Sequence, residues 1–234
     1  MITFFKILAF AASFLRLEKP FISAALKFQP DLVKIVSEKC KTVFVCGSCG
    51  KTSTLIETVS AVKASGVPCK GKVAKSGEGV LCEMLKFMGE GERYLIFEAD
   101  ADKIEAITEL VKPYAVAITN IFTDKNPDEN IYKNFENAFS KFDDVIYVLN
   151  GDEPALFSFC EGSRRYFYGF RINPDFPGGN LRDEEGKICP DCNNPYKYIY
   201  NTYAHLGNYS CEVCGKTRPQ LALGVDRVDA ISEN

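Results

Sequence analysis

The segment VFVCGSCGKTSTL at residues 43–55 constrains the fold of this 234-residue chain more than any other part. It joins a run of β-branched and aromatic residues directly to a glycine-rich turn. The pattern predicts a buried strand at 42–46 and a helix from about Thr52 to Ala64. Strand, turn and helix in that order direct backbone N–H groups outward at the positive end of a helix dipole. Such an arrangement is typical of a site that binds phosphate groups.

The turn matches a short phosphate-loop pattern, GxxGKT, which begins at Gly47. The common form, GxxxxGK followed by Ser or Thr, requires a glycine where this chain has Val45. The pattern predicts that Lys51 contacts the β- and γ-phosphates and that the Thr52 hydroxyl binds Mg²⁺. A chance Gly-Lys-Thr in a turn is the alternative, which the flanking strand and helix disfavour. The predicted ATP and phosphate-binding residues of the loop are Gly47, Ser48, Cys49, Gly50, Lys51, Thr52 and Ser53.

Further strands and helices alternate along the chain. Apolar runs that resemble buried strands lie at 94–100, 114–119 and 145–152, and helical patterns lie at 31–41, 79–88, 102–111 and 129–142. This alternation predicts an α/β fold with a mainly parallel sheet and flanking helices. In such a sheet, ligands bind at the carboxyl ends of the strands.

Polar residues stand at the carboxyl ends of these strands: Glu98 with Asp100, Asn120 with Asp124, and Asn150 with Asp152. A carboxylate there can hold the Mg²⁺ that bridges nucleotide phosphates, but acidic residues at strand ends are also common helix caps. We favour Glu98 as a magnesium ligand, whereas Asp100 before ADKIEAI could be only a cap. The other two pairs have the same two interpretations. Their shared position at one sheet edge favours a ligand-binding site over separate helix caps.

Four cysteines form two C-x-x-C pairs with eighteen residues between them, at Cys189, Cys192, Cys211 and Cys214. Four thiolates at about 2.3 Å complete a tetrahedral zinc site without an open position, so we expect a structural metal. Two disulfides are the alternative, which a reducing compartment disfavours. Aromatic and polar residues alternate between the pairs and predict a ribbon hairpin, with tyrosines packed around the metal.

The other cysteines and the single histidine are not predicted to form a catalytic centre. Cys49 could be reactive, because helix N-termini lower a thiol pKa, but the neighbouring Lys51 is better explained by phosphate. His205 is expected to pack within the ribbon, which leaves no histidine for a hydrolase triad. The cysteines predicted to be ordinary buried residues are Cys40, Cys46, Cys69, Cys82 and Cys160.

The first seventeen residues, MITFFKILAFAASFLRL, are the most apolar part of the chain. A signal peptide is one interpretation, but Lys6 and Arg16 interrupt the stretch, which is shorter than the roughly 20 residues of a membrane span. We predict a helix packed on the domain, with an interfacial helix at the inner membrane face as the alternative. The expected location is cytoplasmic. The net charge of −3 gives no overall reason to expect nucleic acid as the main partner.

Several of these segments resemble the Mur ligases. GSCGKTST is similar to their GTNGKT[ST]T loop, TNIFTD to their TNIxxD segment and LNGDEP to their NADDP segment. The cysteine segment with HLGNYSCEVCGKTRP resembles the zinc ribbon of one branch of the family, the MurT-type subunits of lipid II isoglutaminyl synthase. The likeness covers residues 30 to 220, and the position of the ribbon is its most specific part.

The resemblance implies ATP-dependent amidation of the D-glutamate α-carboxylate in the lipid II stem peptide to D-isoglutamine. A GatD-like glutaminase would supply the ammonia. Lys51 would contact phosphate, and Thr52 and Glu98 would hold Mg²⁺. Asn120 and Asp124 would lie near the nucleotide and metal, and Asn150 and Asp152 would lie near the adenosine.

The chain departs from the family pattern at several positions. Cys49 replaces the loop asparagine, the acidic E-x-D-E run is EADA at 98–101, and KNPDE follows Asp124. AKSGEG at 74–79 replaces an Asn-x-x-Gly-x-Asn element, with Glu78 in place of an amide. The chain also stops at Asn234. The resemblance therefore predicts that the C-terminal ligase domain, which closes over ATP, is absent or separate, and that the chain alone is inactive.

Two other function classes are alternatives to the ligase. One is a non-catalytic, zinc-stapled module that binds ATP or a partner. The other, a zinc-ribbon ATPase acting on nucleic acid, is disfavoured because the ribbon has many tyrosines and few cations. The expected organisation is a helical segment at 1–41, a phosphate-loop domain at 42–186, a zinc ribbon at 187–219 and a return to the central domain at 220–234.

Overall fold

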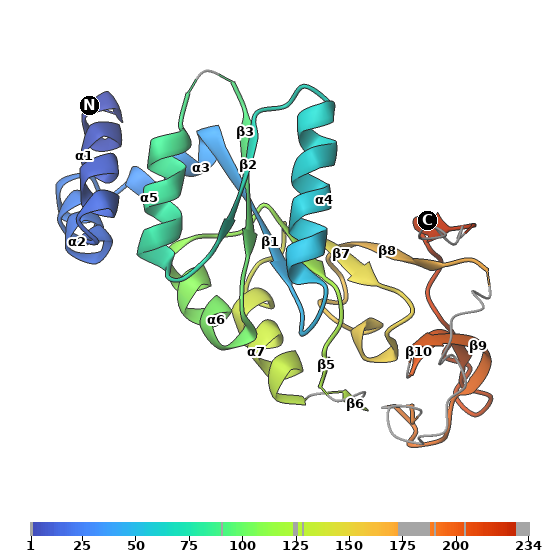
Figure 1. Ribbon diagram of the computed structural model, residues 1–234. Coiled ribbons are helices and arrows are strands. Elements are labelled where there is room, and N and C mark those ends of the chain that lie inside the picture. Colours follow the sequence, from blue (N-terminus) through green and yellow to red (C-terminus); the bar gives the residue numbers. More distant parts are fainter. Residues whose placement is uncertain are drawn as a thin grey trace.

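The structure is a computed structural model, shown in Figure 1. It describes residues 2–89, 91–123, 126–127, 129–172, 188–189, 191–203 and 205–227. Asp124 lies outside the described residues, so its predicted place near the metal stays a prediction.

A seven-stranded sheet forms the centre of the molecule, in the order β11-β8-β7-β4-β1-β3-β2, and every pairing in it is parallel. This confirms the predicted α/β fold. The strands are β1 (Cys40–Cys46), β2 (Cys69–Val73), β3 (Arg93–Glu98), β4 (Ala115–Ile118), β7 (Ile146–Asn150), β8 (Arg164–Phe170) and β11 (Leu223–Val225). Since all of them run in one direction, their carboxyl ends meet at one edge of the sheet.

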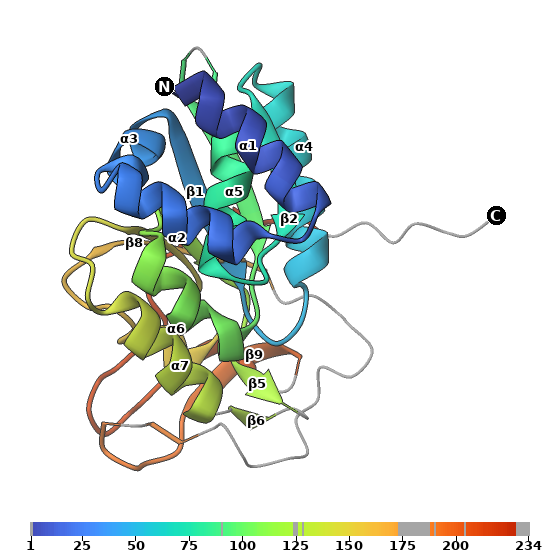
Figure 2. The same ribbon diagram turned by 90° about the vertical axis from the view of Figure 1, so that its left-hand side faces the viewer.

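Helices cover both faces of the sheet (Figure 1). On one side lies α4 (Lys51–Ala64), and on the other lie α5 (Gly77–Phe87), α6 (Ala101–Leu110) and α7 (Glu129–Phe139). Three shorter or more peripheral helices precede the sheet: α1 (Ile2–Phe14), α2 (Glu18–Phe28) and α3 (Leu32–Lys39). Figure 2 shows α1 and α2 as an outer layer over α5. A 3₁₀ turn, η1 (Pro154–Leu156), follows β7.

Two hydrophobic clusters hold these layers together. The larger lies between the sheet and α5, α6 and α7, and includes the buried side chains of Phe44, Phe97, Leu81, Ile107 and Phe135. The smaller lies beneath α4 and contains Val45, Leu55, Cys69 and Ile96. Adjacent strand residues point to opposite faces, so consecutive residues of β1 enter different clusters. The apolar run at 42–46 is therefore buried from both sides.

Three strands of the sheet were not predicted. β2, with the sequence CKGKV, lies at the sheet edge and has only Cys69 buried, so it lacks the apolar run of a central strand. A Cβ at Gly71 would lie 2.9 Å from Cγ2 of Val59, so glycine there lets α4 pack closely. β8 and β11 form the other side of the sheet. The predicted helix at 129–142 ends earlier, at Phe139.

The cysteine-rich segment contains the predicted hairpin. β9 (Lys197–Tyr203) and β10 (Leu206–Ser210) pair antiparallel, and a shorter antiparallel pair joins β5 (Phe122–Thr123) to β6 (Asn126–Pro127). The boundaries placed at residues 42, 187 and 220 stay predictions. Among the described helices, none combines the length and hydropathy that crossing a bilayer requires.

Candidate functional site

The predicted phosphate loop connects β1 to α4 at the carboxyl edge of the sheet. Gly47 has φ +136° and a Cβ there would lie 2.1 Å from Oγ1 of Thr119, so no larger residue fits without a shift. Gly50 is the N-cap residue of α4 in the left-handed region, with φ +76°. Both glycines are therefore required by the backbone path. The N–H groups of the first turn of α4 have no partner within the helix, as at any helix N-terminus.

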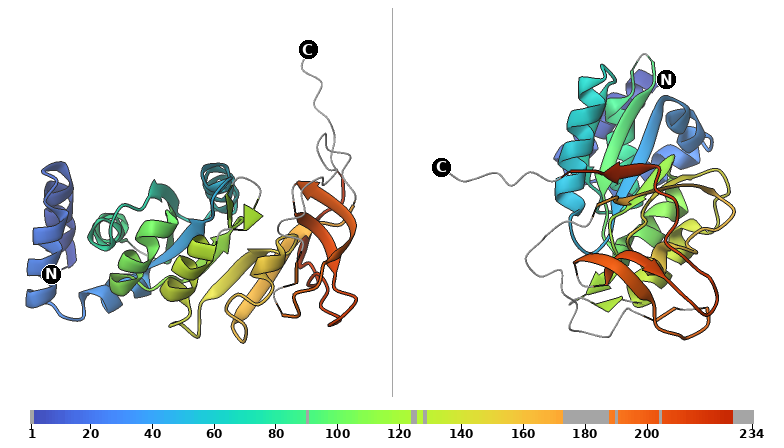
Figure 3. Two further views of the ribbon diagram at one scale, coloured as in Figure 1. Left: turned by 90° about the horizontal axis from the view of Figure 1, so that it is seen from below. Right: turned by 90° about the vertical axis from the view of Figure 1, so that its right-hand side faces the viewer.

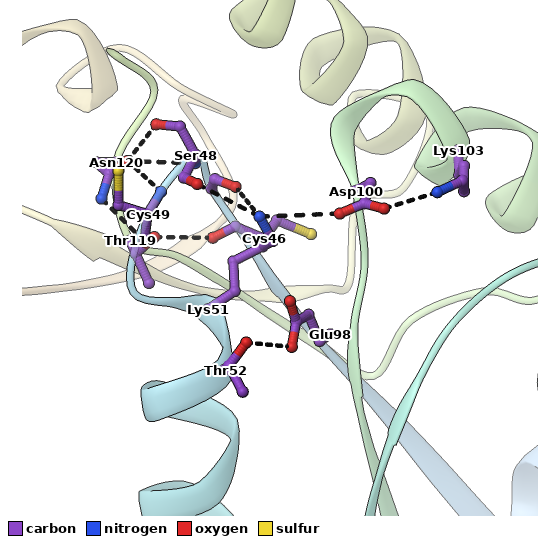
Figure 4. A network of polar contacts seen from close by, with 11 residues as sticks. Cys46, Ser48, Cys49, Lys51, Thr52, Glu98, Asp100, Lys103, Thr119 and Asn120 are labelled. Atoms are coloured by element: carbon purple, nitrogen blue, oxygen red, sulfur yellow. Dashed lines mark hydrogen bonds and ion pairs between the residues drawn. The ribbon is translucent and has the colours of Figure 1, made fainter. Parts of the chain in front are cut away.

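The loop is held in place by two residues at the end of β4 (Figure 4). Oδ1 of Asn120 accepts hydrogen bonds from the Ser48 amide at 3.2 Å and the Cys49 amide at 3.1 Å, and also from the Ser48 hydroxyl. Its Nδ2 donates to the Cys49 carbonyl at 3.1 Å. The Thr119 hydroxyl donates to the same carbonyl at 2.6 Å. Asn120 therefore positions the loop.

Lys51, the first residue of α4, turns back toward the loop. Its Nζ donates to the Gly47 carbonyl at 2.9 Å and lies 3.8 Å from Oδ1 of Asp100. Asp100 also pairs with Lys103 at 2.7 Å, and this hydrogen bond is the main reason that the pKa of Asp100 falls below its ordinary value. Asp100 is the N-cap residue of α6 but makes no side-chain cap hydrogen bond. Its carboxylate faces lysines instead.

Thr52 and Glu98 lie side by side, as the magnesium prediction requires. The Thr52 hydroxyl donates to Oε2 of Glu98 at 2.8 Å, which joins the first turn of α4 to the end of β3 (Figure 4). Hydroxyl and carboxylate oxygens are ligands that Mg²⁺ prefers. Ser53 is exposed on the next position of α4. The structure thus brings the loop, Glu98 and Asn120 to one edge of the sheet.

Asn150 and Asp152, predicted near adenosine, are buried and already bonded within the protein. Asn150 donates to the Thr119 carbonyl at 3.0 Å and accepts from the Asp152 amide at 3.0 Å. The two Asp152 carboxylate oxygens accept from the Phe170 amide at 2.8 Å and from Nη1 of Arg218 at 2.7 Å. Burial raises the pKa of Asp152 more than these bonds lower it. Their contact with adenosine stays a prediction, and their visible role is structural.

A buried hydrogen bond between His205 and Glu153 fixes the hairpin to the sheet. Nε2 of His205 lies 2.8 Å from Oε1 of Glu153, and both side chains are fully buried. The Gly207 amide donates to the Asp152 carbonyl at 2.9 Å, close to this pair. His205 therefore does more than pack within the ribbon as expected, because its side chain also contacts Glu153 in the segment after β7.

The four predicted zinc ligands gather in one cluster. The sulfurs of Cys189, Cys192, Cys211 and Cys214 all lie within 4.8 Å of one another. The closest pairs are 3.5 Å and 3.4 Å apart, too far for a disulfide and near the spacing of a tetrahedral S₄ site. Hydrogen bonds from the amides of Cys214 and Val213 lower the pKa of Cys211, which favours the thiolate. The donor set therefore fits zinc.

The other cysteines mostly match the expectation of ordinary buried residues. Cys40, Cys46, Cys69 and Cys82 are buried, and Cys160 is half-buried. Burial raises the pKa of Cys40 and of Cys82 to about 12, so neither is a ready nucleophile. Cys49 is exposed in the loop.

Sequence reasoning missed three residues around these sites: Thr119, Lys103 and Arg218. Thr119 stands directly before Asn120, and its position at a strand end was the available signal. Arg218 follows the last cysteine of the cluster, Cys214, by four residues, but its partner Asp152 is 66 positions away. No local pattern could have paired them.

No protein-family model matches the chain. In sequence it is 29% identical over 218 residues to the MurT subunit of lipid II isoglutaminyl synthase (glutamine-hydrolyzing) from Streptococcus pneumoniae strain R6. The match covers 90% of this chain and 49% of the relative. The chain thus spans about half the length of the relative that it matches.

In structure, the chain is similar to a pseudomurein peptide ligase type C from Methanothermus fervidus, with a TM-score of 0.63 and 23% identity. That overlap covers 84% of this chain and 40% of the ligase. A MurF ligase from Thermotoga maritima in complex with ADP overlaps less, with a TM-score of 0.47 and 20% identity over 61% of this chain and 37% of that one. The chain is therefore MurT-like in sequence over most of its length, and its fold is of the Mur ligase type.

Proposed function

We propose that this chain binds Mg-ATP at the loop between β1 and α4. The free N–H groups at the start of α4 and the Lys51 ammonium would hold the phosphates. Lys51 is already at the site and would exchange its bond to the Gly47 carbonyl for phosphate oxygens, which are stronger acceptors. The fixed loop and the preformed Thr52–Glu98 pair support this assignment.

The magnesium would lie beside Thr52 and Glu98. These residues supply one hydroxyl and one carboxylate, which is the small protein contribution typical of Mg²⁺ bound mainly by phosphates and water. When bound, Mg²⁺ neutralises charge on the phosphates. Lys51 and Lys103 offset the remaining negative charge of Asp100. Lys51 would thus orient the phosphates and balance part of their charge, while Lys103 stays paired with Asp100.

We further propose that the chain is the ATP-binding part of a MurT-type amide ligase. It would activate the α-carboxylate of D-glutamate in the lipid II stem peptide at the expense of ATP. Ammonia released by a GatD-like glutaminase would then displace the activating group, leaving the amide of D-isoglutamine. The observation that carries this proposal is the 29% identity to a MurT subunit over 90% of the chain.

The cysteine cluster would hold a structural zinc ion. All four positions of a tetrahedral site are filled by protein sulfur, so no position remains for substrate or water. The ribbon is attached to the carboxyl edge of the sheet. Arg218 donates to Asp152 and to the Phe170 carbonyl, and His205 contacts Glu153.

Reconstitution tests the ligase proposal. The chain would be combined with a GatD-like glutaminase, a C-terminal Mur ligase domain, Mg-ATP, glutamine and lipid II, and the product followed by mass spectrometry. We expect conversion of the carboxylate to the amide, lost in Lys51→Ala and retained in Lys63→Ala, which removes an exposed lysine from the far end of the same helix. Mg-ATP binding without any amide would instead identify a non-catalytic ATP-binding module.

A further inference from the structure

Helix α1 is apolar on all sides although it packs on one side only. Its sequence, ITFFKILAFAASF, contains a single charged residue, Lys6, whose Nζ donates to the Met88 carbonyl at 2.7 Å. The side facing α5 buries Phe5, Ala9 and Ala12. A helix without a polar face is normally covered on every side, by protein or by lipid.

The opposite side of α1 presents large apolar side chains to the surroundings. Phe4, Ile7, Phe10 and Phe14 follow helical spacing and are 62%, 63%, 57% and 88% exposed, and Leu15 follows at 60%. We call these five residues the outer α1 face. Clustered exposure of this kind marks a surface that binds something. In Figure 2 this layer faces the viewer, and in Figure 3 (left) it lies at the opposite end of the molecule from the red hairpin.

Charge is segregated in the same part of the chain. Residues 1–41 contain seven Lys or Arg and three Asp or Glu, a net charge of +4, whereas the remainder contains 21 and 28, a net charge of −7. Arg16 is exposed on the turn directly after Leu15, and Lys27 is exposed on α2 beside Phe28, whose ring lies 6.3 Å from that of Phe5 in α1. Lys19 lies elsewhere on α2, in a pocket that Glu78 and Glu109 also line. Arg16 and Lys27 thus add positive charge beside the outer α1 face.

We propose that the outer α1 face docks on the surface of an anionic lipid membrane, with α1 lying in the plane of the interface. The apolar side chains would enter the boundary between headgroups and acyl chains, and the basic residues would face anionic headgroups. A second copy of the chain fits less well, because two faces bordered by like charge would repel. This docking is independent of the ligase activity proposed above.

Vesicle cosedimentation tests the proposal. The probe is a phosphatidylcholine vesicle with about 30% phosphatidylglycerol, compared with phosphatidylcholine alone. We expect the chain to bind the anionic vesicles, and binding to fall roughly tenfold or more in the double variant Phe10→Ser/Phe14→Ser. Ile56→Ser, on α4 and 57% exposed, is the matched control and should bind like the unaltered chain.

A variant with fewer basic residues tests the electrostatic contribution to membrane binding. Arg16→Gln/Lys27→Gln should weaken binding several-fold, as should raised salt, whereas Lys63→Gln/Arg164→Gln should not. Absence of binding to anionic vesicles would overturn the proposal, and so would equal binding by the Phe10→Ser/Phe14→Ser variant. Self-association in solution that the same variant abolishes would assign the face to a second copy instead.

A fluorescence measurement reports insertion directly, because the chain has no tryptophan. Phe14→Trp places a probe at the most exposed position of the outer α1 face. Its emission should shift to the blue on addition of anionic vesicles, while Ile56→Trp should not shift. A Phe14→Trp probe that stays in water while the protein cosediments would contradict docking through this face.

Discussion

Different interactions hold the phosphate loop and the cysteine ribbon in place. The loop is hydrogen-bonded to the end of a central strand, through Thr119 and Asn120, and rests on a sheet with a large core on one face and a smaller core on the other. Among the described residues of the ribbon, the core consists of Cys189, Tyr196, Tyr209 and Cys211, with two partly buried residues around it. A small core of this kind is usually completed by a metal.

Because different interactions hold the two segments, a change that disrupts one should leave the other intact. A change in the loop should alter nucleotide binding and leave the sheet folded, since the sheet does not depend on the loop. Loss of metal should unfold the ribbon and leave the loop in place. The contacts from Asp152 and Glu153 to Arg218 and His205 are where the two regions meet.

Removal of the metal should have the largest effect. Structural zinc contributes on the order of 10 kcal/mol to the folding of small zinc domains, so a chelator or Cys211→Ser should unfold β9 and β10. Hydrogen exchange should then accelerate in the hairpin, while β1 and β3 stay protected. Metal analysis should find one zinc per chain. Unchanged exchange in the hairpin after chelation would show that the ribbon folds without metal.

Breaking the contact between Arg218 of the ribbon and Asp152 of the sheet edge should have the second-largest effect on stability. Arg218→Met removes the partner of the buried Asp152 carboxylate and should lower the free energy of unfolding by about 3 kcal/mol. Asp152→Asn is the matched comparison, because Arg218 keeps the Phe170 carbonyl and the Tyr200 hydroxyl as acceptors and the amide oxygen can still accept a hydrogen bond, so it should cost only about 1 kcal/mol. Urea denaturation measures both. Equal, small losses would mean that the ion pair does not hold the ribbon to the sheet.

Gly47→Ala should have a smaller effect on stability, and the effect should be confined to the loop. The added Cβ would meet Oγ1 of Thr119 at 2.1 Å in a backbone conformation that alanine avoids, so we expect a loss of about 2 kcal/mol. Gly50→Ala has open space around its Cβ and should lose about 1 kcal/mol from its positive φ alone. Thermal denaturation compares them. A larger loss at Gly50 would contradict the loop geometry.

Asp100→Asn should have the smallest effect, about 0.5 kcal/mol, because the ion pairs with Lys103 and Lys51 are partly exposed. The folded-state pKa of Asp100 is lowered, so this stability is present above the unfolded-state pKa and is lost as pH falls through the folded-state pKa. The two proteins should therefore differ at neutral pH and converge in strong acid. Urea denaturation as a function of pH checks this, and a difference that grows in acid would contradict the pairing.

The two regions also differ in how much of each the sequence could predict. Spacing alone placed the four cysteines together, because tetrahedral coordination requires such pairs. Strand-turn-helix order placed Lys51 and Thr52 at the carboxyl edge of the sheet, and the end of the strand at 94–100 placed Glu98 at the same edge. The partners of Asp152 and His205 could not be predicted, because those contacts depend on how distant segments pack. β2 was missed for a related reason: at a sheet edge it buries only Cys69, so its sequence carries no apolar run.

The affinity for Mg-ATP tests the central claim most directly, that the loop between β1 and α4 is a nucleotide site. Calorimetry should detect binding by the unaltered chain. Lys51→Ala should weaken it by roughly 10- to 100-fold, since a charge-assisted contact contributes about 1.5–3 kcal/mol, while Lys63→Ala should bind as the unaltered chain does. Equal affinity in Lys51→Ala, with its fold intact, would contradict the claim.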